Sequence, residues 1–544
     1  MPITRIKNLI NAQTNSITAA AFLVAASSLL SRILGIFRDR ILAGEFGASD
    51  TLDIYYAAFR IPDLIFNLLV LGALSAGFIP IFTNLLKSEK AGEANEQAWH
   101  FSNLVISALG FCLIIISALA MIFTKQMMVV IAPGFGPAKQ ALTIELTRIM
   151  FLSPFFLGIS SILGGMLQSF RRFFVYSLSP IMYNLGIIIG ALYFVPKWGI
   201  AGLAWGVVLG AGIHMLIQLP AAIQLGFRWR LIFDFKDVYL RRLSRLMVPR
   251  TMSLAIAQID LSVATSIATT LLAGSLAIFN FANNLQSFAV GVFGISFAVA
   301  VFPTLAANVH NQKKFIEHFS GTLRQILFFI VPMTVLLLVL RAQIVRVVLG
   351  TGQFNWEDTI LTIRTLGFFT ISLFAQASIP LLTRMFYARE NSRTPFYIGM
   401  VSVVVDIMLA LWLSKTMGVA GLALAFSVAN IVNFILLWLV LRFDLGDLDE
   451  EKIIVSVAKF SAAGLAAGLV AQQMKSVVWP FIDMTRLWGV FAQGAVAGIL
   501  GLTAYFMVCA LLKSEEFYNF FNGIRRRLPF AKARAEDHIE ARGI

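Results

Sequence analysis

Long apolar runs separated by short polar segments make up this chain of 544 residues. About fourteen of the runs reach the roughly 20 residues that an α-helix needs to cross a bilayer. We expect them near residues 16–43, 54–86, 98–124, 141–170, 174–195, 199–225, 244–272, 275–308, 316–340, 359–388, 395–414, 419–441, 453–473 and 485–512. Two shorter stretches, 126–131 and 343–349, predict amphipathic surface helices. The pattern therefore predicts an all-α polytopic membrane protein.

Composition agrees with this pattern and limits the function classes. The chain is 58% hydrophobic and 13% charged, whereas soluble proteins carry about 25% charged residues. Cys112 and Cys509 each lie inside an apolar run, so neither a disulfide framework nor a metal site is expected. The sequence contains no Walker A motif and no catalytic constellation. We therefore predict a transporter and not an enzyme, driven by an ion gradient or the membrane potential.

The net charge of +15 is unevenly placed along the chain. If the amino terminus is cytoplasmic, most basic residues fall in cytoplasmic segments, and the first outer loop, 45–53, has none. This positive-inside asymmetry predicts that both termini are cytoplasmic. Basic residues of two cytoplasmic segments would contact lipid headgroups rather than nucleic acid. They are Arg228, Arg230, Lys236, Arg241, Arg242 and Arg245, and in the tail Arg525, Arg526, Arg527 and Lys532.

The chain also repeats itself. Residues 199–205 (GIAGLAW) return as residues 418–424 (GVAGLAL), and weaker matches upstream keep the same order. Each copy holds six predicted helices, so both copies have the same orientation and form a parallel repeat around a central cavity. We predict an N-terminal bundle (1–225), a C-terminal bundle (226–447), two extra helices (448–513) and a basic cytoplasmic tail (514–544).

Charged residues interrupt the first two apolar runs. Arg32, Arg38 and Asp39 lie in or at the end of the first run, and Arg60 and Asp63 lie in the second. Charge at membrane depth costs several kcal/mol, so such residues usually face a polar cavity or a partner. We favour a cavity cluster over arginines that snorkel to the outer headgroups. Arg60 and Asp63 are three residues apart and could instead form a structural ion pair.

Asp260 and Asp406 are lone carboxylates in long apolar runs of the second half. Such groups must be paired, protonated or bound to a cation. Oxygen ligands suit a hard cation, so Na⁺ or H⁺ is the expected coupling ion, with Ser427 as a candidate third ligand. Two alternatives remain open: a salt bridge to Arg250 or Arg384, and a purely structural role.

Several segments carry a family resemblance. They include residues 31–39 (SRILGIFRD), 59–63 (FRIPD), 72–75 (GALS), 249–251 (PRT) and 386–389 (FYAR). The chain resembles the lipid II flippase family, MurJ (also called MviN), within the multidrug/oligosaccharidyl-lipid/polysaccharide exporter superfamily. The resemblance implies fourteen helices, two of which form a groove for a lipid tail, here at about 453–512. It also implies a bacterial inner-membrane protein that flips lipid II to the outer leaflet for peptidoglycan biosynthesis, cell wall biogenesis and cell shape.

The same resemblance assigns candidate substrate residues. Arg32 and Arg38 carry over as cavity arginines for the substrate's diphosphate, with Asp39 beside them. Arginine suits this role because its planar fork of donors matches phosphate oxygens. Many members carry arginines where this chain has Asn67 and Asn284.

Arg60 and Arg250 are hypothetical substitutes for the missing arginines. The asparagines therefore leave a second function open, a flippase for another polyprenyl-diphosphate-linked oligosaccharide. A cation-coupled drug or metabolite antiporter and a scaffold in the cell-wall machinery are weaker alternatives. We expect a monomer whose partners are its lipid substrate and membrane lipids, and contacts with other cell-wall synthesis proteins stay open. No cofactor is expected beyond the coupling ion.

Overall fold

The computed structural model describes residues 17–71, 77–86 and 91–525, and every regular element in these ranges is a helix. The all-α fold class is therefore confirmed. The motif at 72–75 and most of the predicted basic tail, residues 526–544, lie outside the described residues.

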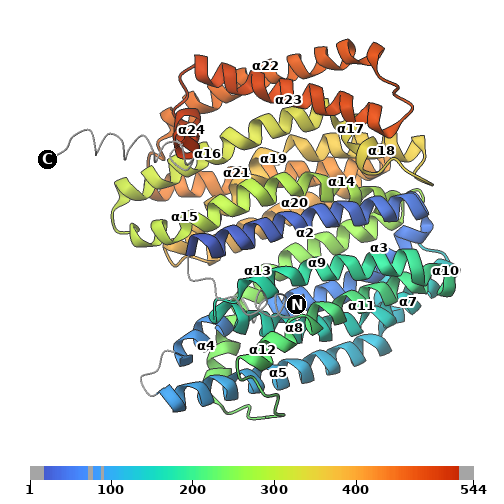
Figure 1. Cartoon of the computed structure of the whole chain (residues 1–544), viewed down its shortest axis with the longest axis vertical. Helices are drawn as coiled ribbons and strands as arrows, with labels where there is room; N and C mark the ends of the chain where they lie inside the picture. Colours follow the sequence, from blue (N-terminus) through green and yellow to red (C-terminus); the bar gives the residue numbers. More distant parts are fainter. Residues whose placement is uncertain (1–16, 72–76, 87–90, 526–544) are drawn as a thin grey trace, which may run out of the picture. The chain divides into compact units, whose positions relative to one another are not determined.

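The helices follow the predicted runs closely (Figure 1). The first part of the chain contains α2 (Ile17–Phe46), α3 (Asp50–Phe66), η1 (Asn67–Leu71), α4 (Ile79–Leu86), α5 (Ala91–Ile122), α6 (Thr124–Ile131), α7 (Pro137–Met150), α8 (Leu152–Ser169), α9 (Phe173–Ile189), η3 (Gly190–Phe194), α10 (Val195–Trp198), α11 (Ala201–Leu216) and α12 (Leu219–Gln224). The remainder contains α13 (Val238–Thr269), α14 (Ser275–Ala289), η4 (Val290–Ile295), α15 (Ser296–Ala307), α16 (Gln312–Val339), α17 (Arg341–Val348), α18 (Trp356–Ile371), α19 (Leu373–Ala388), α20 (Arg393–Met417), α21 (Val419–Leu445), α22 (Glu450–Val478), η5 (Trp479–Phe481), α23 (Leu487–Leu511) and α24 (Glu515–Arg525).

Many of the helices could cross a membrane. Within the described residues, ten helices are long and apolar enough to cross a membrane, or eleven if α18 and α19, bent by 43°, count as one span. The predicted runs 16–43, 54–86 and 244–272 also appear as helices, namely α2, α3 with α4, and α13. The chain is therefore a multi-pass membrane protein, consistent with the expected fourteen helices. The short helices α6 and α17 match the two predicted surface segments.

Two compact units divide the chain by residue contacts. Unit 1 comprises residues 1–281, 348–362 and 403–425, and unit 2 comprises 282–347, 363–402 and 426–544. These groupings differ from the predicted repeat boundaries, because α13 and parts of α18, α20 and α21 belong with the first unit. The repeat and its central cavity remain predictions, and each unit is described by itself below.

Glycines hold two helices of unit 1 in close contact. A Cβ atom on Gly186 of α9 would lie 2.2 Å from the Cα of Gly210 on α11. One turn further on, a Cβ on Gly190 would lie 2.5 Å from the Cα of Gly206. Spacings of four residues place these glycines on one face of each helix, the small-residue pattern that lets membrane helices approach closely. The α9–α11 pair therefore depends on the absence of side chains.

Aromatic packing organises unit 2, where α22 lies along α23 and α16 packs against α22 (Figure 1). Phe328, Phe460 and Tyr505 are almost fully buried in this core. The Tyr505 hydroxyl donates a 2.8 Å hydrogen bond to the carbonyl oxygen of Phe328. A buried hydroxyl needs such a partner, so this bond fixes α23 against α16.

The last described helix, α24, docks on the same unit. Phe520 packs against Phe328 and Phe329, and Arg324 forms a 2.6 Å ion pair with buried Glu516. Burial alone would raise the pKa of Glu516, but hydrogen bonds from Ser514 and Ser456 and the charge of Arg324 lower it below its ordinary value. The charged form of Glu516 is therefore the one that the docked helix stabilises.

Candidate functional site

Arg38 and Asp39 form a polar cluster at the interface of α2 and α9 in unit 1. The Nε and Nη2 atoms of Arg38 donate to Oδ1 of Asp39 at 3.1 and 2.7 Å. Nη1 of Arg38 donates to Oδ1 of Asn184 at 3.1 Å. The Asn184 amide is itself oriented by a 3.1 Å bond to the Pro180 carbonyl oxygen. Arg38 is therefore held in one orientation by a carboxylate and an oriented amide.

The two arginines predicted from the family motif differ in their surroundings. Arg38 retains 21% exposure of its side chain, while the side chain of Asp39 retains 6%. Arg32, six residues earlier on α2, is exposed and makes no ion pair with a described residue. The structure thus brings Arg38 and Asp39 together, and it does not add Arg32 to their cluster.

Arg60 is a buried cation on α3 with unused donors. It is 8% exposed, and neither its Nε nor its Nη1 has a hydrogen-bond partner among the described residues. The nearby hydroxyl of Tyr56 is buried and unpartnered in the same sense. Arg60 and Asp63 do not form the ion pair that their spacing allowed, and Asn67 donates to the Asp63 carbonyl oxygen at 2.9 Å. Buried donors without a partner call for a ligand or water.

The other two candidate diphosphate residues are Asn284 and Arg250. Asn284 lies on α14 within unit 2. Arg250 lies on α13, but its side chain is outside the described part of the structure. Their roles therefore remain predictions from the sequence.

Asp260 of α13 and Asp406 of α20 meet within unit 1. Their carboxyl groups lie close enough to interact with each other, and Asp406 is only 6% exposed. The Oδ1 atom of each is buried and has no hydrogen-bond partner in the described ranges. Two carboxyl groups in contact must share a proton or a cation. The donor set fits either Na⁺ or H⁺.

The predicted third ligand is engaged elsewhere. The Ser427 hydroxyl donates to the carbonyl oxygen of Phe368 at 2.7 Å and accepts from the Ser372 hydroxyl at 2.9 Å, all within unit 2. Arg384, an alternative partner for the carboxylates, donates to the carbonyl oxygen of Pro380 at 2.9 Å. A role for either residue beside Asp260 and Asp406 stays a prediction.

Asp53 forms a contact that the sequence did not reveal. Its carboxylate accepts from the backbone N–H of Gly274 at 2.7 Å and of Ala277 at 2.9 Å, at the first turn of α14. The residue is 2% exposed. A carboxylate in this position satisfies two unpaired donors and complements the helix dipole. In the sequence Asp53 was only an acidic residue of a predicted loop, because its partners are backbone groups 221 or more residues away.

Direct backbone contacts surround this capping interaction in unit 1. The backbone N–H of Gln353 donates to the carbonyl oxygen of Gly44 at 2.8 Å. A Cβ on Gly274 would lie 2.0 Å from the carbonyl oxygen of Ala48, and one on Gly352 would lie 2.1 Å from that of Gly44. We call the contacts of Asp53 and these glycines the closure. The ends of α2 and α3 are thereby fastened to segments of the second half of the sequence.

An apolar groove of about 670 Å³ lies in unit 2. Side chains of α16, α21 and α22 form most of its wall, together with Phe374 of α19. The predicted tail groove falls on the two extra helices, and α22 contributes here whereas α23 lines no part of it. Its use by a lipid tail remains a prediction.

The profile of a family described as "Lipid II flippase MurJ" matches residues 42–492. A probable lipid II flippase MurJ from Rhizobium tropici is 29% identical over 531 residues, covering 93% of this chain and 96% of the relative. One from Buchnera aphidicola subsp. Acyrthosiphon pisum is 29% identical over 420 residues, covering 76% and 81%.

Solved structures give the same fold. A structure titled "Lipid II flippase MurJ, inward closed conformation" matches with a TM-score of 0.73 and 24% identity, covering 90% of this chain and 98% of that one. An inward-facing multidrug resistance MATE family transporter of the MOP superfamily matches with a TM-score of 0.65 and 16% identity, covering 78% and 98%. This chain shares its fold with both of these proteins, and the family profile spans most of the sequence. The chain therefore belongs to the lipid II flippase MurJ family.

Proposed function

We propose that this chain flips lipid II from the inner to the outer leaflet of the bacterial inner membrane by alternating access. The observation that carries the proposal is the oriented Arg38, held between Asp39 and Asn184 in a chain of this family. A guanidinium fixed in this way presents its fork of donors to phosphate oxygens with little loss of side-chain entropy on binding. The substrate's diphosphate is the matching anion.

Asp39 balances the charge of Arg38 in this site. Its carboxylate neutralises Arg38 while no substrate is bound, so the cation does not stand alone at membrane depth. An arriving diphosphate then shares Arg38 or replaces Asp39 as its partner. Arg60 supplies further donors, because two of its nitrogens are buried without a hydrogen-bond partner among the described residues. Roles for Arg32, Arg250 and Asn284 in headgroup binding stay predictions from the sequence.

Alternating access requires that the closure open and re-form. Releasing Asp53 from the first turn of α14 exposes two backbone donors and a carboxylate, so the closed state is favoured until the headgroup arrives. Asp260 and Asp406 couple this opening to an ion gradient. Binding of Na⁺ or H⁺ between them holds α13 against α20, and its release frees those helices.

Topology and lipid contacts complete the proposal. Both termini lie in the cytoplasm, as the placement of basic residues favours. The polyprenyl tail stays in the bilayer and runs along the apolar groove of α16, α21 and α22. One chain performs the whole cycle, and no ATP or enzymatic step is needed.

Complementation tests the proposal. The chain is expressed in bacteria depleted of their own lipid II flippase, and growth and lipid II at the outer leaflet are measured. Rescue by the parent and by Arg486→Ala, but not by Arg38→Ala, is the expected result, since Arg486 lies in the exposed turn before α23. A well-inserted parent that leaves lipid II on the inner side would contradict the proposal.

A second candidate function rests on Asn67. Its amide nitrogen is committed to its own helix backbone and brings no charge where many members carry arginine. This favours, as the alternative, a flippase for another polyprenyl-diphosphate-linked oligosaccharide. The same strain separates the two functions, because only a protein that flips lipid II restores its growth.

A further inference from the structure

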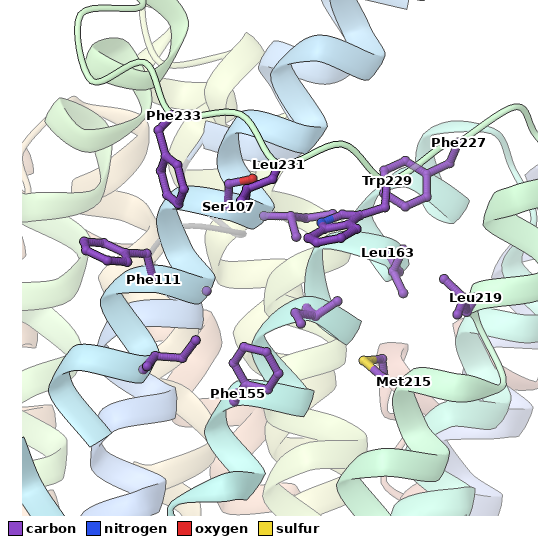
Figure 2. Close-up of a pocket in the computed structure, with 14 residues that line it drawn as sticks. Ser107, Phe111, Phe155, Leu163, Met215, Leu219, Phe227, Trp229, Leu231 and Phe233 are labelled. Atoms are coloured by element: carbon purple, nitrogen blue, oxygen red, sulfur yellow. The ribbon is translucent and has the colours of Figure 1, made fainter. Parts of the chain in front are cut away.

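An irregular segment, residues 226–237, joins α12 to α13 in unit 1, and we call it the strap. Apolar and polar side chains alternate along it. Figure 2 shows Phe227, Trp229, Leu231 and Phe233 of the strap lining one pocket. Arg228 and Arg230, the residues between them, line a different, more polar pocket. The strap therefore separates an apolar side from a basic side.

Side chains of α5 hold the strap in place. The amide of Asn103 donates to the carbonyl oxygen of Arg228 at 3.0 Å and accepts from the backbone N–H of Arg230 at 2.8 Å. One turn further on, the Ser107 hydroxyl accepts from the backbone N–H of Ile232 at 3.2 Å. Residues four apart share a helix face. One face of α5 therefore supplies the hydrogen-bond partners for the backbone of the strap.

Beneath the strap lies an apolar groove of about 460 Å³ (Figure 2). Its walls come from α5, α8, α11 and α12, and Ser107 is its one hydroxyl-bearing residue. That hydroxyl is already engaged with the strap. Trp229 remains 63% exposed and Phe111 45% exposed. An open apolar hollow on membrane-spanning helices is a poor site for water and a suitable one for an acyl chain.

The charged residues beside the groove indicate which headgroup would accompany an acyl chain. Six basic residues occupy the strap and the first turns of α13, and all are exposed: Arg228, Arg230, Lys236, Arg241, Arg242 and Arg245. The two carboxylates of this stretch are committed to backbone donors. Asp237 caps α13 by accepting from the backbone N–H of Tyr239 and Leu240, and Asp234 accepts from that of Lys236. Glu96 of α5 is a further carboxylate in the polar pocket of Arg228 and Arg230, but the six basic residues outnumber the three acidic ones, so the patch keeps a net positive charge for a phosphate headgroup.

We propose that the strap groove binds a glycerophospholipid with an anionic headgroup, its acyl chain under Trp229 and its phosphate beside Arg228 and Arg230. An apolar hollow next to a patch of net positive charge at the end of spanning helices matches an amphiphile with one anionic end. The arginines are exposed, unlike the oriented Arg38, so they suit a lipid that exchanges freely with the bilayer. This site is distinct from the diphosphate cluster and does not depend on transport.

Quenching of Trp229 tests the proposal. The purified full chain is reconstituted in vesicles of phosphatidylcholine with a minor share of phosphatidylglycerol, and bromine atoms are placed on the acyl chains of one lipid or the other. The Trp229 signal is the difference between the parent and Trp229→Phe. We expect stronger quenching by brominated phosphatidylglycerol than by brominated phosphatidylcholine at equal mole fraction. Each arginine should contribute about fivefold to this preference.

Matched variants separate the groove from ordinary bilayer contact. Gly110→Leu fills the groove, because a Cβ there meets only Phe155, at 3.8 Å, and should abolish the preferential quenching. Gly399→Leu, on α20 with nothing within 4 Å of its Cβ, should retain it. Arg228→Gln with Arg230→Gln should abolish the preference without affecting folding, since both side chains are exposed.

Three results would overturn the proposal. One is equal quenching by the two brominated lipids, which indicates bulk bilayer contact. Another is preferential quenching that survives both Gly110→Leu and the double arginine variant. The third is displacement of phosphatidylglycerol by a small amount of a polyprenyl diphosphate lipid, which would assign the groove to the transported lipid instead.

Discussion

Replacing the Asp53 carboxylate by an amide should loosen the closure. The Asp53 carboxylate is 2% exposed and accepts two backbone hydrogen bonds, from Gly274 and Ala277. In Asp53→Asn the single amide oxygen can replace only one of the two acceptors, and the interaction with the helix dipole is lost. A hydrogen bond to a charged group contributes about 1.5–3 kcal/mol, and the dipole adds about 0.3–2 kcal/mol. The closed state should lose about 2–4 kcal/mol, which is roughly 30- to 1,000-fold in the opening equilibrium.

Cysteine labelling measures this change. Ser275→Cys, a conservative change at a residue that is 5% exposed in the closure, is introduced after Cys112 and Cys509 are replaced by alanine. The rate of labelling by a polar maleimide in lipid nanodiscs then reports how often the closure opens. In the Asp53→Asn background this rate should rise by the factor given above.

Asp50→Asn is the matched control. Asp50 lies on the same helix and pairs with Lys139 at 2.6 Å, but the two side chains are 44% and 38% exposed. Surface pairs of this kind contribute at most about 1 kcal/mol, so labelling should change little. Parent-like labelling of Asp53→Asn, or an equal rise in Asp50→Asn, would refute the reasoning.

Three further predictions concern packing, acid sensitivity and coupling. Gly206→Val should separate α9 from α11 and destabilise the protein by about 1–3 kcal/mol, whereas Gly212→Val on the same helix, with nothing within 4 Å, should melt like the parent in a thermal unfolding assay. Glu516 has a folded pKa below its ordinary 4.5, so its contribution is present above that value and is lost as pH falls through the folded pKa. The melting temperature should therefore drop in acid for the parent but stay flatter for Glu516→Gln. Asp406→Asn should make lipid translocation insensitive to Na⁺ and pH gradients, as a flux assay with imposed gradients would detect.

The sequence predicts most of the fold because a membrane restricts what an apolar run can become. About 20 apolar residues must form a helix, since no other backbone arrangement satisfies its own polar groups in lipid. The helices α5, α16 and α23 therefore lie where hydropathy places them. Lone carboxylates in apolar runs mark polar positions in the same way, and the structure brings Asp260 and Asp406 close to each other.

Contacts between distant segments could not be predicted in this way. Asn184 holds Arg38 from 146 residues away, and an asparagine in an apolar run has many possible partners. The partners of Asp53 are backbone N–H groups, which every residue except proline carries, so no residue type marks them. Ser427 illustrates the same difficulty. It lies on α21, the helix that follows Asp406 in the chain, but its hydroxyl donates to the backbone carbonyl oxygen of Phe368 on α18.

The most direct test of the central claim is lipid II translocation by the purified chain with Arg38 changed. Proteoliposomes containing fluorescent lipid II are assayed for headgroup arrival at the opposite leaflet, with the parent, Arg38→Lys, Arg38→Ala and the exposed control Arg486→Ala. We expect transport by the parent and the control, a strong loss in Arg38→Lys because the fork of donors is gone, and no transport in Arg38→Ala. Transport by Arg38→Ala at the parent's rate would contradict a diphosphate-binding role for Arg38.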